Sequence, residues 1–551
     1  MNYLSKYEFW LKHATDSSVV ESLQAMAGND GEIKNAFYKD LEFGTAGLRG
    51  IMTAGTDRMN VYTVYRATEG LARYMEAHKM TTCSITYDSR LNSQLFAEVS
   101  AATLARHGIK VYITEECMPT PYLSYMVRNY HTDTGINVTA SHNPQEYNGY
   151  KVYDSYGCQL TDDAAMEVTG YINGVDPFGA ELPKFSDYVG GLIVYSDKEM
   201  EESYINRVLQ ESLNDAKGLS AVYTPLNGAG YRVVPEVLRR IGLEDMQIVP
   251  EQAMPDGRFP TCTYPNPEKK ETMALAVAMA KQSGADIVIG NDPDCDRLGV
   301  AVRTNGDYRI LTGNEVGILL CDYVLSKLSE TGKLPQDPVL VKTIVTTIMV
   351  DAIAKQYGAE VRDVLTGFKY IGNVIAELEE KGQEQRYLFG FEESCGYLKG
   401  TYVRDKDGVV ASMLVAQCAN YHKQKGQTLV DRLEQLYDKL GLYFQQTVSY
   451  AFGGADGAER KAQLLANLRA NPIQNLGESK VVRSCDFLTQ TEFALPKADV
   501  LRYNSEDGSQ LIVRPSGTEP LIKCYITVCG DKSVIDSRFQ GIKQQMDKIF
   551  G

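Results

Sequence analysis

Three aspartates in one short segment, Asp292, Asp294 and Asp296, are the strongest chemical signal in the sequence. They come directly after the apolar run 285–290, which is typical of a buried strand, so we expect them in a loop at the end of that strand. At alternate positions of an extended loop, three carboxylates point to one side and repel one another unless a cation neutralises them. Oxygen ligands of this kind suit Mg²⁺. The segment therefore predicts a magnesium site, and a solvated acidic loop is the alternative.

A second polar segment, residues 139–144, follows the apolar run 135–138 and contains Ser141 and His142. We expect these side chains on a loop beyond the end of a strand, where α/β sheets place their ligands. An ordinary turn is the alternative, since serine, asparagine and proline are common in turns. The pair does not predict a hydrolase triad, because adjacent side chains are expected to diverge and no GxSxG motif is present.

Two further loops carry groups that could bind a phosphorylated sugar. Residues 514–520 combine the guanidinium of Arg514 with hydroxyl groups and with backbone N–H groups freed by a glycine, which favours a phosphate site. Residues 390–396 place Glu392 and Ser394 on a tight loop after a strand expected at 386–389, and such side chains suit sugar hydroxyls. Either loop could be an ordinary surface turn when it is considered alone.

The elements that must position these loops repeat one order: an apolar strand, a loop, an amphipathic helix, a glycine and a second strand. The helices are expected near 95–106, 233–240 and 348–356, followed by Gly108, Gly242 and Gly358. Glycine adopts the left-handed conformation that ends a helix without steric cost, and such βαβ units build sheets covered by helices. The tail differs, because 500–513 predicts a hairpin before a strand at 521–528 and a final helix. We therefore predict an α/β fold: three similar mixed or parallel-sheet α/β domains in series and a smaller C-terminal α+β domain.

The length of 551 residues also indicates about four domains of ~150 residues. The formal net charge of −15 argues against binding to nucleic acid or to anionic membranes, since both require a positive field. No run of about 18 apolar residues and no secretory core is present. The 11 cysteines are scattered without CxxC pairs, which favours reduced thiols. We expect a cytoplasmic protein, a monomer or small homo-oligomer, that binds small anionic molecules.

Taken together and in this order, segments 43–50, 139–144, 292–297, 390–396 and 514–520 resemble the α-D-phosphohexomutase superfamily, and most closely its phosphoglucomutase/phosphomannomutase branch. The resemblance implies four domains around a central cleft. It implies a phosphoserine-loop domain at 1–200, a metal-binding domain at 201–312, a sugar-recognition domain at 313–435 and a C-terminal phosphate-binding domain at 436–551. It also implies that Ser141 carries a phosphoryl group, and that an oxygen of this group joins Asp292, Asp294 and Asp296 in binding Mg²⁺.

The resemblance implies further roles, residue by residue. Near the reacting centre it places Arg49, His142, Lys151 and Arg297. In substrate binding it places Thr366, Gly367, Lys369, Glu392, Ser394, Arg514, Ser516, Gly517 and Thr518. A sugar hydroxyl needs a base to become a good nucleophile. The candidates for this base are Lys151, His142 and Arg297, and the sequence does not choose among them.

The activity that the resemblance implies is interconversion of glucose 1-phosphate and glucose 6-phosphate, with glucose 1,6-bisphosphate as intermediate and activator. Sugar phosphates are then the small-molecule partners. Alternatives within the family are a phosphomannomutase, a phosphopentomutase and a hexose bisphosphate synthase. Two other classes also stay open: a Mg²⁺-dependent phosphatase with an aspartyl nucleophile, and a catalytically silent sensor of sugar phosphates.

Overall fold

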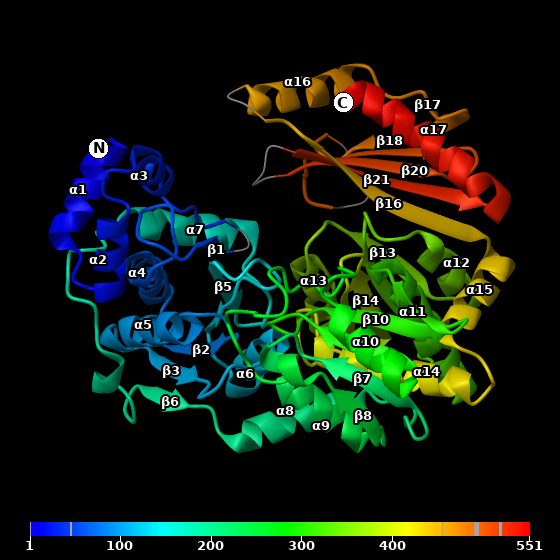
Figure 1. Cartoon of the computed structure of the whole chain (residues 1–551), viewed down its shortest axis with the longest axis horizontal. Helices are drawn as coiled ribbons and strands as arrows, with labels where there is room; N and C mark the ends of the chain where they lie inside the picture. Colours follow the sequence, from blue (N-terminus) through cyan, green and yellow to red (C-terminus); the bar gives the residue numbers. More distant parts are fainter. Residues whose placement is uncertain (1, 45–46, 454–455, 490–494, 517–520) are drawn as a thin grey trace. The chain divides into compact units, whose positions relative to one another are not determined.

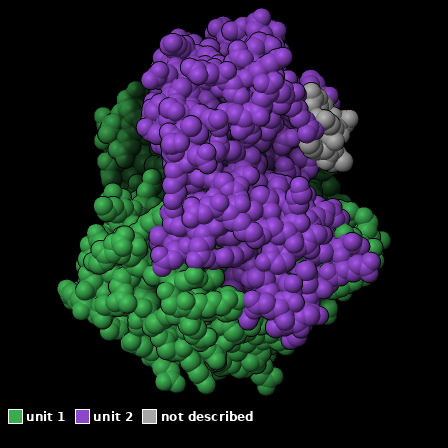
Figure 2. Space-filling model, turned by 90° about the vertical axis from the view of Figure 1, so that its right-hand side faces the viewer, with its two compact units in different colours: residues 1–320, 368–428 green, residues 321–367, 429–551 purple. Residues whose placement is uncertain are grey.

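The computed structural model describes residues 2–44, 47–453, 456–489, 495–516 and 521–551 (Figure 1). The chain divides into two compact units, which Figure 2 draws in different colours. Unit 1 comprises residues 1–320 and 368–428, and unit 2 comprises residues 321–367 and 429–551. The chain therefore leaves unit 1 after residue 320, returns to it at residue 368 and leaves it again after residue 428.

The first sheet of unit 1 is mixed, with the strand order β1-β5-β4-β2-β3-β6. Strand β4 pairs in parallel with β2 and antiparallel with β5. Helix α5 packs against β2 and β3, and α6 packs against β2 and β4. The strands are β1 (Leu48–Ile51), β2 (Thr82–Tyr87), β3 (Lys110–Ile113), β4 (Thr134–Val138), β5 (Tyr147–Asp154) and β6 (Ile193–Tyr195). The helices are α1 (Tyr3–His13), α2 (Ser17–Ala25), α3 (Asp30–Phe37), α4 (Val61–Ala77), α5 (Ser93–Arg106), α6 (Thr120–Tyr130), α7 (Asp162–Asn173) and α8 (Lys198–Gln210).

The second sheet of unit 1 has the order β11-β10-β9-β7-β8. Its central strand β9 pairs in parallel with β7 and antiparallel with β10. The segment between β9 and β10 therefore lies at the carboxyl ends of the parallel strands. The elements of this part are β7 (Ser220–Thr224), α9 (Val233–Arg240), β8 (Asp245–Ile248), α10 (Ala274–Ser283), β9 (Ile287–Asn291), β10 (Leu298–Thr304) and β11 (Asp307–Leu311). Unit 1 is completed by α13 (Phe368–Glu380), β14 (Tyr387–Glu392), β15 (Gly396–Lys399) and α14 (Gly408–Lys423).

Unit 2 contains a parallel strand pair and a separate six-stranded antiparallel sheet. The pair is β12 (Val339–Thr343) and β13 (Glu360–Val364), connected by α12 (Met349–Gln356). The sheet has the order β16-β21-β20-β19-β18-β17, and α17 packs against β21 and β16. Its elements are β16 (Leu442–Ala451), α16 (Gly457–Ala470), β17 (Asn475–Leu476), β18 (Ser479–Asp486), β19 (Leu501–Ser505), β20 (Gln510–Pro515), β21 (Leu521–Gly530) and α17 (Lys532–Phe550). Helices α11 (Gly313–Glu330) and α15 (Leu429–Leu440) lie at the points where the chain enters unit 2.

The three predicted βαβ units are present. Gly108, Gly242 and Gly358 have φ angles of 77°, 88° and 66°, and they connect α5 to β3, α9 to β8 and α12 to β13. Each second strand pairs in parallel with the strand before its helix. The predicted C-terminal hairpin is also present, as the antiparallel pair β19 and β20. The predicted α/β fold class is therefore confirmed. Within the described ranges, no helix is both long and apolar enough to cross a bilayer.

Candidate active site

Ser141 lies on the loop that leaves the end of β4. The backbone turns sharply there, because Ser141 has a φ of 53°, in the left-handed region that residues with side chains rarely adopt. Its backbone N–H donates a hydrogen bond to Thr139 Oγ1 at 2.7 Å. Its buried hydroxyl donates to Asp292 Oδ2 at 3.0 Å. The serine loop of the first sheet and the acidic loop of the second sheet therefore meet.

His142 lies beside the serine oxygen. Its Nδ1 atom is 3.1 Å from Ser141 Oγ, so the expectation that these adjacent side chains diverge is wrong. The left-handed backbone at Ser141 accounts for the difference, because it turns the two side chains toward the same side. Burial, together with the positive charges of Arg297 and Arg49, lowers the pKa of His142 well below its ordinary value. The imidazole is therefore neutral near pH 7.

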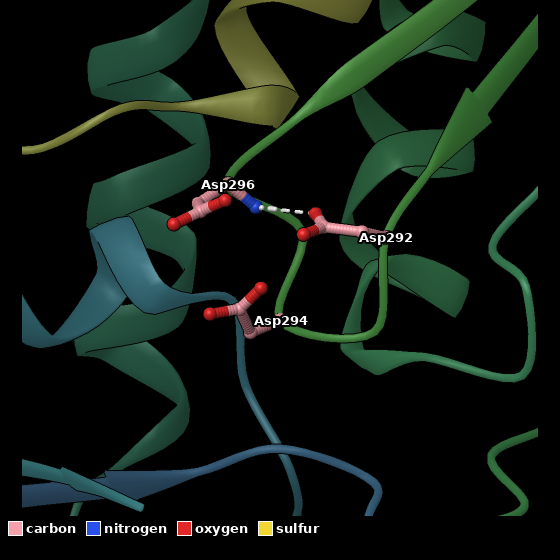
Figure 3. Close-up of side chains that lie close together, drawn as sticks. All are labelled: Asp292, Asp294 and Asp296. Atoms are coloured by element: carbon pink, nitrogen blue, oxygen red, sulfur yellow. Dashed lines mark hydrogen bonds between the residues drawn. The ribbon is translucent and has the colours of Figure 1, made fainter. Parts of the chain in front are cut away.

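The three aspartates follow β9 in a tight turn, and Figure 3 shows their carboxylates gathered on one side of it. The backbone N–H of Cys295 donates to Asp292 O at 2.8 Å, and Cys295 has a φ of 53°. One carboxylate oxygen from each of Asp292, Asp294 and Asp296 lies within 4.8 Å of the others. The predicted extended loop is thus wrong, because a turn brings the carboxylates together. We call residues 292–296 the acidic turn.

Basic side chains balance the buried carboxylates. Lys151 Nζ lies 3.2 Å from Asp294 Oδ2, and Lys406 Nζ lies 3.1 Å from Asp296 Oδ2. Arg297 Nε is 3.9 Å from Asp296 Oδ1. Burial and the charge of Asp294 raise the pKa of Asp296. For Asp294, burial opposes ionisation, but the nearby Lys151 ammonium holds the pKa of the carboxyl well below its usual range.

The acidic turn keeps unused acceptor atoms. Asp294 Oδ1 and Asp296 Oδ1 are buried and have no hydrogen-bond partner. Buried polar atoms without a partner are rare, and an ion or a water accounts for many of them. Burial and the charges of the other two aspartates also raise the pKa of Asp292 well above its usual range, a cost that a bound cation would remove. Across the described part of the chain, this trio is the one group of acidic, histidine or cysteine side chains arranged to hold a metal ion. Its all-carboxylate donor set fits a hard divalent cation.

Backbone from two other segments packs directly against the acidic turn. A Cβ atom on Gly228 would lie 2.5 Å from Pro293 Cα, and one on Gly408 would lie 2.5 Å from Cys295 O. Ala229 N–H donates to Pro293 O at 2.8 Å. These glycines permit a backbone approach that a side chain would block, and the local sequence pattern does not identify them as part of the site.

Two side chains at the acidic turn were also missed. The hydroxyl of Thr120, the first residue of α6, donates to Asp294 Oδ2 at 2.9 Å. Lys406 lies between Asp296 and Asp405, at 3.1 and 3.2 Å. Burial lowers the pKa of Lys406, but the two carboxylates outweigh burial and raise it above its usual range. The alternating charges of residues 404–407, which follow the end of β15 after four intervening residues, are a sequence signal that could have identified Lys406.

Glu392 and Ser394 lie in the hairpin formed by β14 and β15. The first strand is expected to end at residue 389, whereas β14 continues to Glu392 and β15 begins at Gly396. The loop is therefore shorter than predicted. Burial of Phe391 explains the longer strand, because its ring stacks with that of Tyr397 across the hairpin, with centroids 6.1 Å apart.

The same hairpin is hydrogen-bonded to the strand that follows the acidic turn. Leu298 N–H, at the start of β10, donates to Cys395 O at 3.0 Å. The negative charge of Glu392 also favours the protonated form of Lys406 and so helps to raise its pKa. The hairpin with the predicted sugar-binding residues is therefore adjacent to the carboxylates.

The other predicted site residues of unit 1 have separate contacts. Arg49, on β1, donates to Asn143 Oδ1 at 3.2 Å and thus contacts the serine loop. Lys369, on α13, forms an ion pair with Asp162 at the start of α7. Its ammonium group is therefore already bound to a carboxylate.

The remaining predicted substrate-binding residues belong to unit 2. Thr366 and Gly367 follow β13, and Gly367 has a φ of 118°. Arg514 lies on β20, and Ser516 N–H donates to Leu521 O at 2.9 Å. Gly517 and Thr518 lie outside the described residues.

The fold and the site define a multidomain α/β enzyme in which a buried serine lies beside a turn of three carboxylates. Models of the phosphoglucomutase/phosphomannomutase family match the chain in order: alpha/beta/alpha domains I, II and III at residues 40–177, 202–306 and 312–440, and the C-terminal domain at residues 459–542. The chain belongs to this family, as its sequence motifs predicted.

Individual relatives agree with this assignment. A Staphylococcus aureus (strain MRSA252) protein named phosphoglucomutase is 36% identical over 540 residues, which cover 95% of this chain and 96% of that protein. The structure of a phosphoglucomutase/phosphomannomutase family protein from Burkholderia thailandensis matches with a TM-score of 0.69 and 18% identity, over 92% of this chain and 97% of that one. Aspergillus fumigatus N-acetylphosphoglucosamine mutase, in complex with GlcNAc-6P and magnesium, matches with a TM-score of 0.51 and 14% identity, over 98% of this chain and 100% of that one. The two structural likenesses support the fold.

Proposed function

We propose that this protein interconverts glucose 1-phosphate and glucose 6-phosphate, with Ser141 as the carrier of the phosphoryl group. The observation that carries the proposal is the 3.0 Å contact between Ser141 Oγ and Asp292, within a buried carboxylate turn flanked by Lys151 and Lys406. The name of the S. aureus relative supports glucose as the sugar. We also propose the domain limits 1–200, 201–312, 313–435 and 436–551 given above.

Mg²⁺ is the proposed metal, held by Asp292, Asp294, Asp296 and an oxygen of phosphorylated Ser141. The two unpartnered carboxylate oxygens support this choice, and the A. fumigatus neighbour was solved with magnesium. When bound, such an ion acts as a Lewis acid that draws charge from the transferring phosphoryl group.

Basic side chains of the chain itself would hold the phosphoserine, which carries a charge of about −2. Lys151, Lys406 and Arg297 already lie at the carboxylates and would offset this charge. In the transfer, the bond from phosphorus to Ser141 Oγ breaks and a bond from phosphorus to the sugar oxygen forms. The sugar hydroxyl loses a proton and the serine oxygen gains one. His142, neutral and 3.1 Å from Ser141 Oγ, is the group that we propose to exchange a proton with the serine.

A bisphosphorylated sugar must then turn so that its other phosphate faces the same serine, and glucose 1,6-bisphosphate is the proposed intermediate and activator. Glu392 and Ser394 are proposed to hold sugar hydroxyls. Arg49, which contacts the serine loop, is proposed to act near the reacting centre. The proposed contacts to the substrate and its second phosphate are Thr366, Gly367, Lys369, Arg514, Ser516, Gly517 and Thr518. The net charge of −15 disfavours binding to nucleic acid and to anionic membranes. We further propose a cytoplasmic protein whose partners are small sugar phosphates, as a monomer or small homo-oligomer.

The test combines mass spectrometry with a coupled assay. We expect intact protein incubated with glucose 1,6-bisphosphate to gain the mass of one phosphoryl group, and Ser141→Ala to gain none and lose activity. Turnover of glucose 1-phosphate should exceed that of mannose 1-phosphate and ribose 1-phosphate, and a higher kcat/KM for either rival would reassign the sugar. An active Ser141→Ala variant together with an inactive Asp292→Asn variant would instead indicate a phosphatase with an aspartyl nucleophile. Absence of any phosphoryl adduct on wild-type protein would favour a sensor.

A further inference from the structure

Four backbone carbonyls of the serine loop converge on one buried guanidinium. Arg90 Nη1 donates to the carbonyls of Pro144 and Tyr147, at 2.8 and 3.0 Å. Arg90 Nη2 donates to the carbonyls of Ser141 and Asn143. Arg90 is 3% exposed, so water does not substitute for it at these carbonyls. One side chain thus fixes the course of residues 141–147.

A second connection holds the amide of the serine itself. Asp88 Oδ2 lies 3.3 Å from Arg90 Nε and accepts a hydrogen bond from Thr139 Oγ1 at 2.6 Å. Thr139 Oγ1 in turn accepts the hydrogen bond from Ser141 N–H at 2.7 Å. Asp88 also accepts from Arg90 N–H at 3.0 Å and from Ser93 Oγ at 2.7 Å. The carboxylate is therefore fixed on several sides, and its orientation passes through Thr139 to Ser141.

Residues 257–259, in the part of unit 1 that contains the second sheet, also pack against Arg90. The guanidinium carbon of Arg90 lies 5.2 Å from the centroid of the Phe259 ring. Phe259 has a φ of 42°, and a Cβ atom on Gly257 would lie 2.3 Å from Leu91 N. A bulky residue keeps such a backbone conformation only where its surroundings impose it. Arg90 is thus packed between the serine loop and residues 257–259.

We propose that Arg90, Asp88 and Thr139 are positioning residues that hold Ser141 in its left-handed conformation, with its oxygen directed at the acidic turn. The inference rests on the proposed function of Ser141 as phosphoryl carrier. The side chains of Arg90 and Asp88 are fully buried, so they act through the loop and not through the substrate. The residues that we propose to bind the substrate lie outside the serine loop, on the β14–β15 hairpin, on α13 and in unit 2. Loosening the loop should therefore lower kcat and leave KM unchanged.

Thr139 offers the sharpest variants, because valine and serine separate its shape from its hydroxyl. Thr139→Val keeps the volume and removes both hydrogen bonds, whereas Thr139→Ser keeps the hydroxyl. We expect Thr139→Val to lower kcat by about 10²-fold, the order of loss that a misplacement of 1 Å produces. KM should stay at the wild-type value, and Thr139→Ser should retain most of the activity.

Arg90→Lys tests the guanidinium. A lysine ammonium carries its three N–H donors on one nitrogen, so it cannot donate to all four carbonyls as the planar guanidinium does. The matched control is Arg258→Lys, since the Arg258 side chain is 73% exposed and pairs with Asp256. We expect Arg90→Lys to lower kcat as Thr139→Val does, and Arg258→Lys to match wild type. Hydrogen exchange of the peptide covering residues 139–147 supplies a readout that needs no activity, and it should become faster in Thr139→Val. If Arg90→Lys fails to fold, the two Thr139 variants decide the question.

Each outcome bears on the proposal. The proposal would be overturned if both Thr139→Val and Arg90→Lys kept the wild-type kcat, or if hydrogen exchange at residues 139–147 did not change. The proposed function would still hold in that case, provided that the wild-type protein is phosphorylated on Ser141. Equal losses in Thr139→Ser and Thr139→Val would also overturn it, since the hydroxyl would then be irrelevant. If wild-type protein accepts no phosphoryl group on Ser141, the proposed function fails and this inference fails with it.

Discussion

Replacing Thr120 by valine would remove one hydrogen bond from the acidic turn with almost no change in volume. The Thr120 hydroxyl donates to Asp294 Oδ2 at 2.9 Å and accepts from Asn137 Nδ2 at 2.7 Å. Its backbone N–H, which donates to Asp294 O at 2.8 Å, is unaffected by the substitution. The substitution therefore tests the orientation of a single carboxylate, and Thr120→Ser is the matched control that keeps the hydroxyl.

The structure sets the expected magnitude. A hydrogen bond to a charged group contributes about 1.5–3 kcal/mol, and the amide of Asn137, left without this acceptor, adds a cost of about 1–3 kcal/mol. We therefore expect the metal-free Thr120→Val protein to unfold at a lower urea concentration than wild type. Loss of a side chain that orients a metal ligand typically weakens metal binding by about 10- to 100-fold. At about 1.4 kcal/mol for each tenfold step, this corresponds to about 1.4–2.8 kcal/mol of binding free energy.

Calorimetric titration of Mg²⁺ into wild type, Thr120→Val and Thr120→Ser would measure this effect without reference to activity. The expected order of affinity is wild type, then Thr120→Ser close behind, then Thr120→Val. Equal affinities in wild type and Thr120→Val would refute the argument that this hydroxyl orients Asp294. Equal weakening in both variants would show that the methyl group of Thr120, not its hydroxyl, matters.

Three further predictions concern stability and backbone approach. Burial raises the pKa of Asp154 to about 6, so the folded state favours the protonated carboxyl, and the stability that this provides is lost as pH rises through 6. Asp154→Asn should therefore stabilise the protein against urea at pH 8, by at most about 3 kcal/mol, and have little effect below pH 4. Burial lowers the pKa of His107, but two glutamates outweigh burial and raise it above 6.5, so His107→Gln should lower the urea midpoint more at pH 6 than at pH 9. Gly408→Ala places a Cβ atom 2.5 Å from Cys295 O and should cost about 1–3 kcal/mol, with weaker Mg²⁺ binding, whereas Gly170→Ala meets nothing within 4 Å and should not destabilise the protein. If pH changes the urea midpoint of Asp154→Asn or of His107→Gln as much as that of wild type, the corresponding pKa argument is wrong. If Gly408→Ala and Gly170→Ala affect Mg²⁺ binding equally, the argument from backbone approach is wrong.

Local patterns in the sequence were enough to predict the βαβ units and the loops that carry the site. Apolar runs before residues 139 and 292 correspond to β4 and β9, and Gly108 and Gly242 end helices as expected. These features depend on neighbours a few residues away, because hydrogen bonds within a turn and the alternation of apolar side chains are local. The same reasoning erred at Phe391, whose stacking on Tyr397 across the hairpin extends β14 beyond the expected end of the strand.

Sequence patterns alone predicted the βαβ units, the family and the loops that carry carboxylates, hydroxyls and guanidinium groups. Only the tertiary structure placed the hydroxyl of Ser141 against Asp292, which is 151 residues away in the chain, and brought Lys406 and Arg90 to the two loops. Their roles depend on which buried charges and carbonyls lack partners after the sheets pack. That balance is set by desolvation and by contacts between residues far apart in the chain, and neither can be read from local spacing.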